Sequence, residues 1–418
     1  MRILFLAHRV PYPPDKGDKI RSYHEIRHLA QRHDVHLIAC ADRAEDLLHA
    51  PRLREFLASV TILPLAPVWG KLRALAALFT GGSLSVRYFM PPSLRAAVAR
   101  AVRGAPGFDA VFAYSSAMAA PVTSLTLPVV VDFVDVDSAK FEHYGRTETP
   151  PMAWVHRREA RRLRAFERRV AESVPLTLVC TADEARVLQS FARPCRLEVL
   201  ENGIDLSRYA FVFPEARRAS AVFVGAMDYL ANVDACEHFA RAILPLVRRE
   251  LPEFQFRIVG RHPTRRVQAL HDGASVVVTG AVADVNAELN GASVSVAPLR
   301  VARGIQNKVL EAFAAGTPVV ASSAAAEGIE ATSGEHLLVA DQPAEFARAV
   351  VMLVRDRVRA RALATAARAL VERRYRWEAG LERLEQLIVE TVAACGRGPM
   401  AGGGQTTSGV GGNRTSVG

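Results

Sequence analysis

The stretch GIQNKVLEAFAAGTPVV, residues 304–320, holds two side chains suited to chemistry, Lys308 and Glu311. If a helix begins near Gln306, both lie on one face of it together with Gly304. A helix N-terminus offers free N–H groups and partial positive charge, which suit a phosphate, and Lys308 would add a full charge. Glu311, one turn deeper, can accept two hydrogen bonds from a diol such as a ribose. The pattern fits a nucleoside diphosphate; an i, i+3 ion pair on a solvated helix is an equal alternative.

The apolar residues of the same stretch predict which face of this helix is buried. Val309, Leu310 and Phe313 point away from the charged face and toward a core. Gly316 suits the position just past a helix end, and Pro318 begins the next strand.

Composition limits the classes of function. The 418 residues suffice for about two domains, and half of them are hydrophobic. The net charge of +10 permits anionic partners, but no basic and aromatic interleaving indicates a nucleic-acid module, so we expect no nucleic-acid partner. Five lysines stand among 53 basic residues, and four of them fall in or beside loops placed at the cleft; chance placement is an equal explanation. They are Lys16, Lys19, Lys71, Lys140 and Lys308, of which Lys71 is the exception.

Cysteine usage and hydropathy predict the compartment. The five cysteines are scattered without a CxxC pair, which fits reduced thiols better than disulfides or a zinc site. No apolar run approaches the roughly 20 residues that span a bilayer, and no secretory signal is recognised at the start. We therefore expect a cytoplasmic protein, with contact at the inner face of the cell membrane as an option.

Short apolar runs alternate with helical segments along the chain. RILFLAH, DVHLIACA, DAVFAY, PVVVDFV and LTLVC predict strands in the first half, and SAVFVGA, FQFRIVG, SVVVTG, SVSVAPL and TPVVAS in the second. IRSYHEIRHLAQR predicts a helix after the first strand. Such runs are typical of parallel sheets covered on both faces, so we predict an α/β protein with two doubly wound domains and a cleft at the carboxyl ends of their strands.

Two further segments and the tail carry weaker signals. Residues 68–82 are apolar but contain Lys71 and Arg73, so they form an amphipathic helix or lie on a membrane surface. Residues 154–173 predict an arginine-rich helix with a solvated face, or secondly with anionic lipid contact. Residues 396–418 are rich in Gly, Ser and Thr and are predicted to be disordered.

The motifs taken in order resemble retaining glycosyltransferases of family 4, which have the GT-B fold. The resemblance spans about residues 1–392 and rests on the Gly17 loop, ENGID, the Gly225 loop, VTGAV and KVLEAFAAGTPVVAS. The segment DFVDVDSAKFEHY is similar to sugar transferases found with exosortase and exopolysaccharide systems. The resemblance implies an acceptor-side domain at 1–210, a nucleotide-sugar domain at 211–375 and a helix at 376–395 that crosses back to the first domain.

The resemblance also implies roles for single residues. Glu311 matches the second glutamate of the E-x7-E motif, which holds the ribose, while Gly17 approaches the donor diphosphate. Val282 matches the position that contacts the base, and Lys308 faces the diphosphate. The remaining predicted donor-binding residues are Gly225, Gly304 and Asn307.

Two departures from the family stand out. The first glutamate of E-x7-E is replaced by Arg303, and the Arg and Lys pair after VFVG is missing, with Ala226 and Met227 there instead. We therefore predict that Arg303 and Lys308 replace the missing cations and stabilise the leaving diphosphate. Asp137 completes the predicted catalytic set.

Other polar groups can be explained by structural roles as well as by functional ones. Asp135 and Asp137 imitate a metal-binding D-x-D, but we predict acceptor-side groups or a capped turn. Ser115 and Ser116 follow another strand and are predicted on the acceptor side without a covalent role. His24, Glu25 and His28 spell H-E-x-x-H, but no third ligand is found, so we expect no metal.

The predicted function is transfer of a hexose-type sugar from a nucleotide-diphosphate donor to a lipid-linked or polysaccharide acceptor. By resemblance the anomeric configuration is retained, and no cofactor or metal is required. A GT-B nucleotide-sugar epimerase and a catalytically silent nucleotide-sugar-binding partner of a polysaccharide complex are the alternatives.

Overall fold

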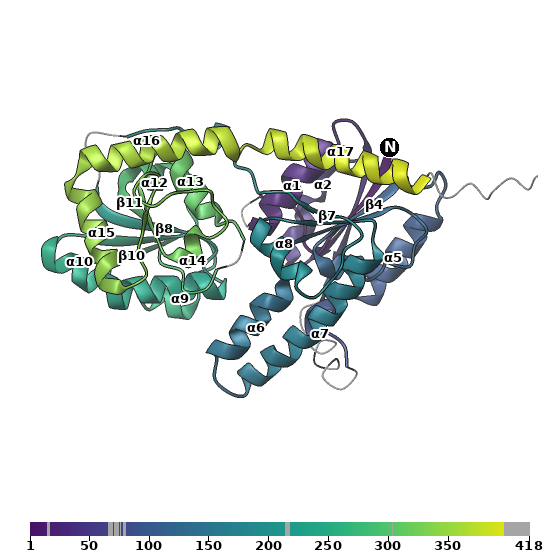
Figure 1. The fold of residues 1–418 in the computed structure, drawn as a ribbon, viewed down its shortest axis with the longest axis horizontal. Helices are drawn as coiled ribbons and strands as arrows, with labels where there is room; N and C mark the ends of the chain where they lie inside the picture. The colour runs from purple at the N-terminus through teal and green to yellow at the C-terminus, as the bar shows by residue number, and fades with distance from the viewer. Residues whose placement is uncertain are drawn as a thin grey trace, which may run out of the picture.

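The computed structural model describes residues 1–14, 17–65, 70, 75, 77, 81–213, 218–302 and 304–396. Within them the chain forms two α/β domains, each built on a parallel sheet, which lie side by side in Figure 1. The prediction of two doubly wound domains is confirmed. The residue numbers at which we expect the domains to divide stay a prediction.

The first sheet has the strand order β3-β2-β1-β4-β5-β6-β7. The order reverses direction between β1 and β4, and a crevice opens beyond the strand ends at such a point. Its strands are β1 (Arg2–Ala7), β2 (Asp34–Ala41), β3 (Ser59–Pro64), β4 (Ala110–Tyr114), β5 (Val129–Val134), β6 (Leu176–Val179) and β7 (Leu197–Val199). Its helices are α1 (Gly17–Leu29), α2 (Ala50–Arg54), α4 (Leu84–Tyr88), α5 (Pro92–Arg103), α6 (Asp137–Thr147), α7 (Met152–Ser173) and α8 (Ala182–Gln189).

The second sheet has the order β10-β9-β8-β11-β12-β13, with its reversal between β8 and β11. Its strands are β8 (Arg218–Val224), β9 (Gln255–Val259), β10 (Val276–Gly280), β11 (Ala292–Ala297), β12 (Val319–Ala321) and β13 (Leu338–Val339). Its helices are α9 (Leu230–His238), α10 (Leu244–Glu250), α11 (Arg265–Gln268), α12 (Val285–Gly291), α13 (Asn307–Ala315), α14 (Ser323–Ala326), α15 (Pro343–Arg355) and α16 (Arg357–Arg374).

Both faces of the first sheet are buried, which explains the continuous apolar runs. Along β1, Ile3 and Phe5 join one core cluster while Leu4 and Leu6 join the other, and all four are 0 % exposed. Successive side chains on a strand point to opposite faces, so a strand covered on both sides must be apolar at every position.

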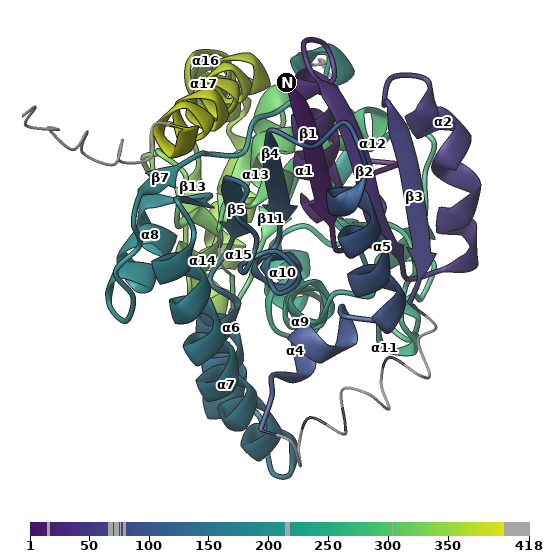
Figure 2. The same ribbon diagram turned by 90° about the vertical axis from the view of Figure 1, so that its right-hand side faces the viewer.

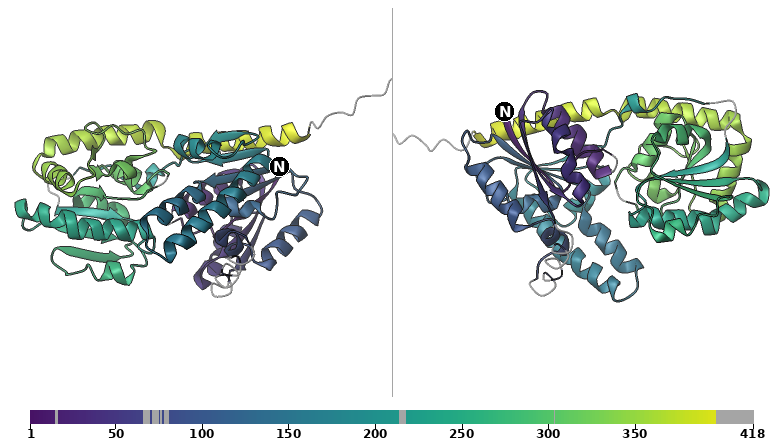
Figure 3. Two further views of the ribbon diagram at one scale, coloured as in Figure 1. Left: turned by 60° about the horizontal axis from the view of Figure 1, so that its bottom comes forward. Right: turned by 180° about the vertical axis from the view of Figure 1, so that it is seen from behind.

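The last helix, α17 (Trp377–Gly396), belongs to the core of the first domain. In Figure 1, α16 lies along the top of the second domain and α17 continues along the top of the first, and the rear view in Figure 3 shows the same crossing. Leu384 and Leu387, each 0 % exposed, pack in the cluster that contains β1. Burial of each leucine is worth about 2 kcal/mol, which holds the crossing helix in place.

The long helices α6 and α7 pack together and project beyond the rest of the first domain (Figures 1 and 2). The arginine-rich helix predicted at 154–173 is therefore present as α7. The helix predicted from Ile20 begins earlier, at Gly17. Most of the predicted amphipathic segment at 68–82, and the tail beyond Gly396, lie outside the described residues.

Candidate functional site between the domains

The helix that carries Lys308 and Glu311 has the predicted form. In α13, Val309 and Phe313 are at most 1 % exposed and face the core of the second domain. The helix ends at Gly316, whose φ is +81°, and a Cβ there would lie 2.8 Å from the ring of Phe211. Only glycine fits this left-handed, crowded position, so the helix end is fixed.

Glu311 faces a small cavity between the two domains. Helix α1 contributes His24 to this cavity, and α13 contributes Asn307 and Glu311. The hydroxyl of Tyr209 donates a hydrogen bond to the Glu311 carboxylate. Burial raises the pKa of Glu311, although this hydrogen bond and the charge of Lys308 oppose the rise. A polar ligand group could replace the tyrosine hydroxyl at this carboxylate.

Lys308 turns toward the strand end of the second sheet. Its Nζ donates to Oε1 of Gln306 at 3.0 Å and lies 5.6 Å from the ring centre of Phe223 on β8. Burial lowers the pKa of Lys308 to about 8, while the charge of Glu311 acts in the opposite sense. Among the contacts of the described residues, the alternative ion pair between Lys308 and Glu311 is not formed.

The N-termini of α1 and α13 meet across the cleft. A Cβ built on Gly17 would lie 3.5 Å from Nδ2 of Asn307, so the first residues of the two helices are in contact range. The Oδ1 atom of Asn307 is buried without a hydrogen-bond partner in the described part of the chain. Two helix N-termini that lie this close together favour an anion near them.

Asp135 reaches from the first domain to the loop before α13. Gly304 has a φ of +62°, and a Cβ on it would lie 2.4 Å from Oδ1 of Asp135 and 3.0 Å from Sγ of Cys180. The Cys180 thiol donates to Asp135 Oδ1 at 3.1 Å. Burial raises the pKa of Asp135. The carboxylate predicted on the acceptor side therefore touches the loop before α13 in the second domain.

Asp137 begins α6 and holds a lysine at the cleft. Its Oδ1 lies 3.2 Å from Nζ of Lys140, which in turn lies 5.7 Å from the ring centre of Tyr229 in the second domain. The charge of Asp137 is the largest cause of a raised pKa at Lys140, so this cation persists at all ordinary pH values.

Two family models match the chain in sequence. One, described as glycosyltransferase family 4, covers residues 20–208, and the other, described as glycosyl transferases group 1, covers residues 218–356. Together they take in the whole second sheet and all of the first sheet except β1. The chain is a glycosyltransferase of the GT-B type. No curated protein was found that matches it in sequence.

Solved structures share the fold of this glycosyltransferase. Sucrose-phosphate synthase from Thermosynechococcus elongatus superposes with a TM-score of 0.71 at 17 % identity, covering 94 % of this chain and 100 % of that one. HepE from Anabaena, solved with UDP and glucose, gives 0.68 at 15 %, covering 93 % and 100 %. WaaG, a glycosyltransferase involved in lipopolysaccharide biosynthesis, gives 0.63 at 16 %, covering 92 % and 99 %.

The loop after β8, which lacks the family's cations, is closely packed. A Cβ on Gly225 would lie 2.7 Å from Nδ2 of Asn232, which donates to the Ala226 carbonyl at 2.9 Å. Val282, predicted to lie near the base, follows the turn at Gly280 and packs at the margin of the second core.

Arg43 of the first domain reaches the loop after β8, and the sequence analysis did not identify it. Arg43 lies 3.0 Å from the carboxylate of Asp228 and also contacts His262. Tyr209, the partner of Glu311, was missed as well. The contact between Tyr209 and Glu311 joins residues 102 positions apart, and no local sequence pattern indicates it.

The remaining predicted residues are placed as follows. Arg303 lies outside the described residues. Ser115 has a φ of +79° and follows β4, and Ser116 begins the short turn Ser116–Ala119 at 2 % exposure. The Ser116 hydroxyl is therefore closed to a ligand in this conformation.

The H-E-x-x-H residues make packing and ionic contacts within the first domain. His24 stacks on Trp377 at 4.8 Å, and His28 contacts Glu385 at 3.1 Å. Glu25 is 0 % exposed and lies 3.0 Å from Arg21. Across the described residues, no three His, Cys, Asp or Glu side chains are grouped to hold a metal ion.

A search of the helices in the described part of the chain finds none that is both long and apolar enough to cross a membrane.

Proposed function

We propose that the protein transfers a hexose-type sugar from a nucleoside-diphosphate sugar to a hydroxyl group of a lipid-linked or polysaccharide acceptor, in bacterial exopolysaccharide biosynthesis. The observation that carries the donor part is the meeting of the α1 and α13 N-termini across the cleft. HepE, of the same fold, was solved with UDP-glucose. The likeness supports a nucleotide sugar as donor.

In the proposed complex the diphosphate lies at the two helix N-termini. Backbone N–H groups near Gly17 and Gly304 bind its oxygens, and Glu311 exchanges the Tyr209 hydroxyl for the ribose hydroxyls. Gly225 and Val282 lie toward the base. The anomeric C–O bond to the diphosphate breaks, the acceptor oxygen bonds to the same face of the sugar, and its proton passes to the leaving phosphate oxygen. Retention and this order of events rest on the family resemblance.

Cations of this chain would stabilise the leaving group without a metal or cofactor. Lys308 and Arg303 are the proposed pair, since the usual pair after β8 is absent. Lys140 adds a permanent charge from the first domain, held at the cleft by Asp137. Asp135, Ser115 and Ser116 are proposed on the acceptor side, where Ser116 would require a shift of its turn.

We also propose that the enzyme works in the cytoplasm and contacts the inner face of the cell membrane. Its net charge of +10 and the arginines of α7 favour an acidic surface. A lipid-linked acceptor would be met at that surface.

The test is thermal stability of the protein with UDP, GDP, ADP, TDP and CMP, in the presence of a chelator. A nucleotide at 100 times its Kd should stabilise the fold by roughly 2.7 kcal/mol. Glu311→Gln should lose this stabilisation, because the amide cannot accept the two ribose hydrogen bonds as the carboxylate does. Glu345→Gln, an exposed change on α15, is the matched control and should retain it.

The second step is turnover of the nucleotide sugar that binds. Transfer to a lipid or glycan acceptor supports the proposal, whereas a new sugar epimer formed without acceptor indicates an epimerase. Binding without any turnover indicates a silent binding partner, which the arginine at position 303 would explain. No stabilisation by any nucleotide would remove the proposal.

A further inference from the structure

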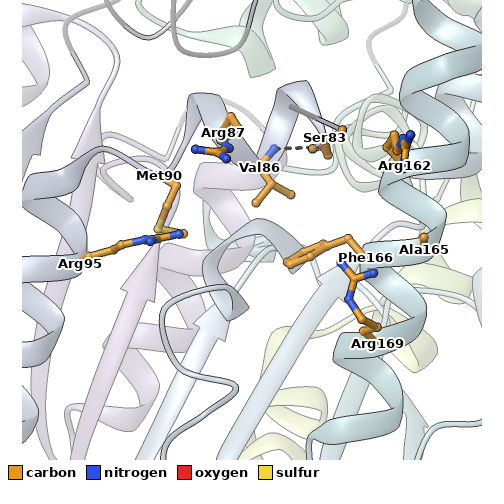
Figure 4. Close-up of a pocket in the computed structure, with 11 residues that line it drawn as sticks. Ser83, Val86, Arg87, Met90, Arg95, Arg162, Ala165, Phe166 and Arg169 are labelled. Carbon is orange, nitrogen blue, oxygen red and sulfur yellow. Dashed lines mark hydrogen bonds between the residues drawn. The ribbon is translucent and has the colours of Figure 1, made fainter. Parts of the chain in front are cut away.

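A cavity of about 220 Å³ lies away from the donor site, between α4, α5 and α7 (Figure 4). Val86, Met90 and Phe166 form its apolar part. Four arginines from the three helices surround it, and Figure 4 shows Arg95 and Arg169 entering from opposite sides. The four are Arg87, Arg95, Arg162 and Arg169.

These four arginines lack a counter-charge within the described residues: no carboxylate lies within 4.0 Å of any of them. Residues 66–80, which lead into the cavity in sequence, contain no Asp or Glu either. On the same helix, Arg164 pairs with Glu142 and Arg168 with Glu172. The arginines that face the cavity thus differ from paired neighbours, and gathering four like charges is unfavourable unless an anion joins them.

The rim of the cavity is fixed by a buried pair of α7 residues. Glu159, 1 % exposed, accepts hydrogen bonds from Ser83 Oγ at 2.6 Å and from the N–H of Leu84 at 2.7 Å. Arg158, 8 % exposed, donates to the Gly82 carbonyl at 3.2 Å. The loop before α4 is therefore held rigidly against α7, so the cavity is a built feature of the fold.

We propose that this cavity binds a phosphate group carried by an amphipathic molecule. Guanidinium groups bind phosphate oxygens in bidentate fashion, and four of them can enclose one phosphate or a diphosphate. The apolar wall at Met90 and Phe166 accepts the alkyl part next to the phosphate. Trp154, 60 % exposed near the start of α7, offers an aromatic side chain of the kind found at membrane interfaces.

The phosphate site deepens the membrane contact proposed above, and it is independent of the donor cleft. Binding to it is tested on the full chain without nucleotide. If the cavity binds no phosphate, the nucleotide-binding test of the donor cleft is not affected. If Glu311→Gln does not change nucleotide binding, the test of the phosphate site is not affected.

The experiment compares two double variants of equal charge change. Arg162→Gln/Arg169→Gln removes two cavity cations, and Arg361→Gln/Arg373→Gln removes two exposed arginines of α16 as control. The probes are vesicles of phosphatidylcholine with and without phosphatidylglycerol, followed by flotation, and inorganic diphosphate, followed by thermal stability. A basic residue near an acidic surface contributes enough affinity that the cavity variant should bind the acidic vesicles roughly 30-fold more weakly.

The outcomes distinguish the source of the phosphate. Loss of acidic-vesicle binding in the cavity variant alone assigns the site to a lipid headgroup. Stabilisation by diphosphate that the cavity variant alone loses, without vesicle binding, assigns it to a free phosphate compound. Binding of neither probe by the wild type, or equal losses in both variants, overturns the proposal. Arg87→Gln/Arg95→Gln, on the other two helices, repeats the test if the α7 variant melts early.

Discussion

The charge of Lys308 depends directly on its packing. Burial lowers its pKa to about 8 from the usual 10.5. If this cation binds a diphosphate, the Kd of the nucleotide should be constant below about pH 8 and rise up to tenfold per pH unit above it. Lys308→Arg, which stays charged, should remove this rise, and Lys308→Met should weaken binding at least tenfold at neutral pH.

The same lowered pKa affects stability with a definite sign. Between pH 8 and 10.5 the unfolded chain binds the proton at Lys308 and the folded chain does not, so the free energy of unfolding should rise with pH across this window. Denaturant titrations of wild type and Lys308→Met at two pH values measure it. A wild type with no more pH dependence than the variant contradicts the buried position of the amine.

At this scale the sequence predicts local geometry and little else. The faces of α13 and the role of Gly316 follow from periodicity and backbone sterics over a few residues. The contacts of Glu311 with Tyr209 and of Gly304 with Asp135 do not, because each pair comes from distant parts of the chain.

Among the elements, α17 is joined to the α1 region by one carboxylate in addition to its buried leucines. Glu385 contacts His28 at 3.1 Å, Arg32 at 2.8 Å and His33 at 3.2 Å on or just after α1. Glu385→Gln should therefore lower the free energy of unfolding by roughly 1–2 kcal/mol, the sum of three partly exposed pairs. Glu382→Gln, an exposed change on the same helix, should have almost no effect.

The pH dependence of this contact follows from two groups. Burial lowers the pKa of His33, so the unfolded chain takes up the proton first and stability falls as the pH drops below about 6.5. The pKa of Glu385 is lowered as well: burial opposes this, but Arg32 and the other partners outweigh it, so its contribution disappears at still lower pH. Because the Glu385 carboxylate partly offsets the lowering of the His33 pKa, thermal melting from pH 8 to 5 should show Glu385→Gln losing more stability than the wild type.

Element prediction succeeds where both faces of a strand are buried. The strands that form the centres of both sheets were predicted from apolar runs. The strand β3 was missed because it lies at a sheet edge and exposes Ser59 and Thr61 between apolar residues. The strand β13 has only two residues, too few for a pattern.

At the scale of the whole molecule, side chains of both domains contact each other across the cleft. Arg43 with Asp228, and Lys140 with Tyr229, join the domains at the loop after β8 and at its end. Gly304 packs directly on Asp135. Contacts of this kind bring groups of the two domains together, and in the proposed complex closure of the cleft would exclude water from the transferred sugar.

Whether the contact between Gly304 and Asp135 holds the two domains together can be tested by adding one methyl group at Gly304. Gly304→Ala would place a Cβ 2.4 Å from Asp135 Oδ1, and the domains should separate to relieve the clash. Gly334→Ala is the matched control, because its φ of +88° is equally unfavourable for alanine but nothing lies within 4 Å. Both variants should lose about 1 kcal/mol of stability from the backbone alone. Only Gly304→Ala should show a larger radius of gyration in small-angle scattering and at least tenfold weaker nucleotide binding. Adding Asp135→Ala should restore the compact form, and equal behaviour of the two glycine variants would mean that this contact does not hold the domains together.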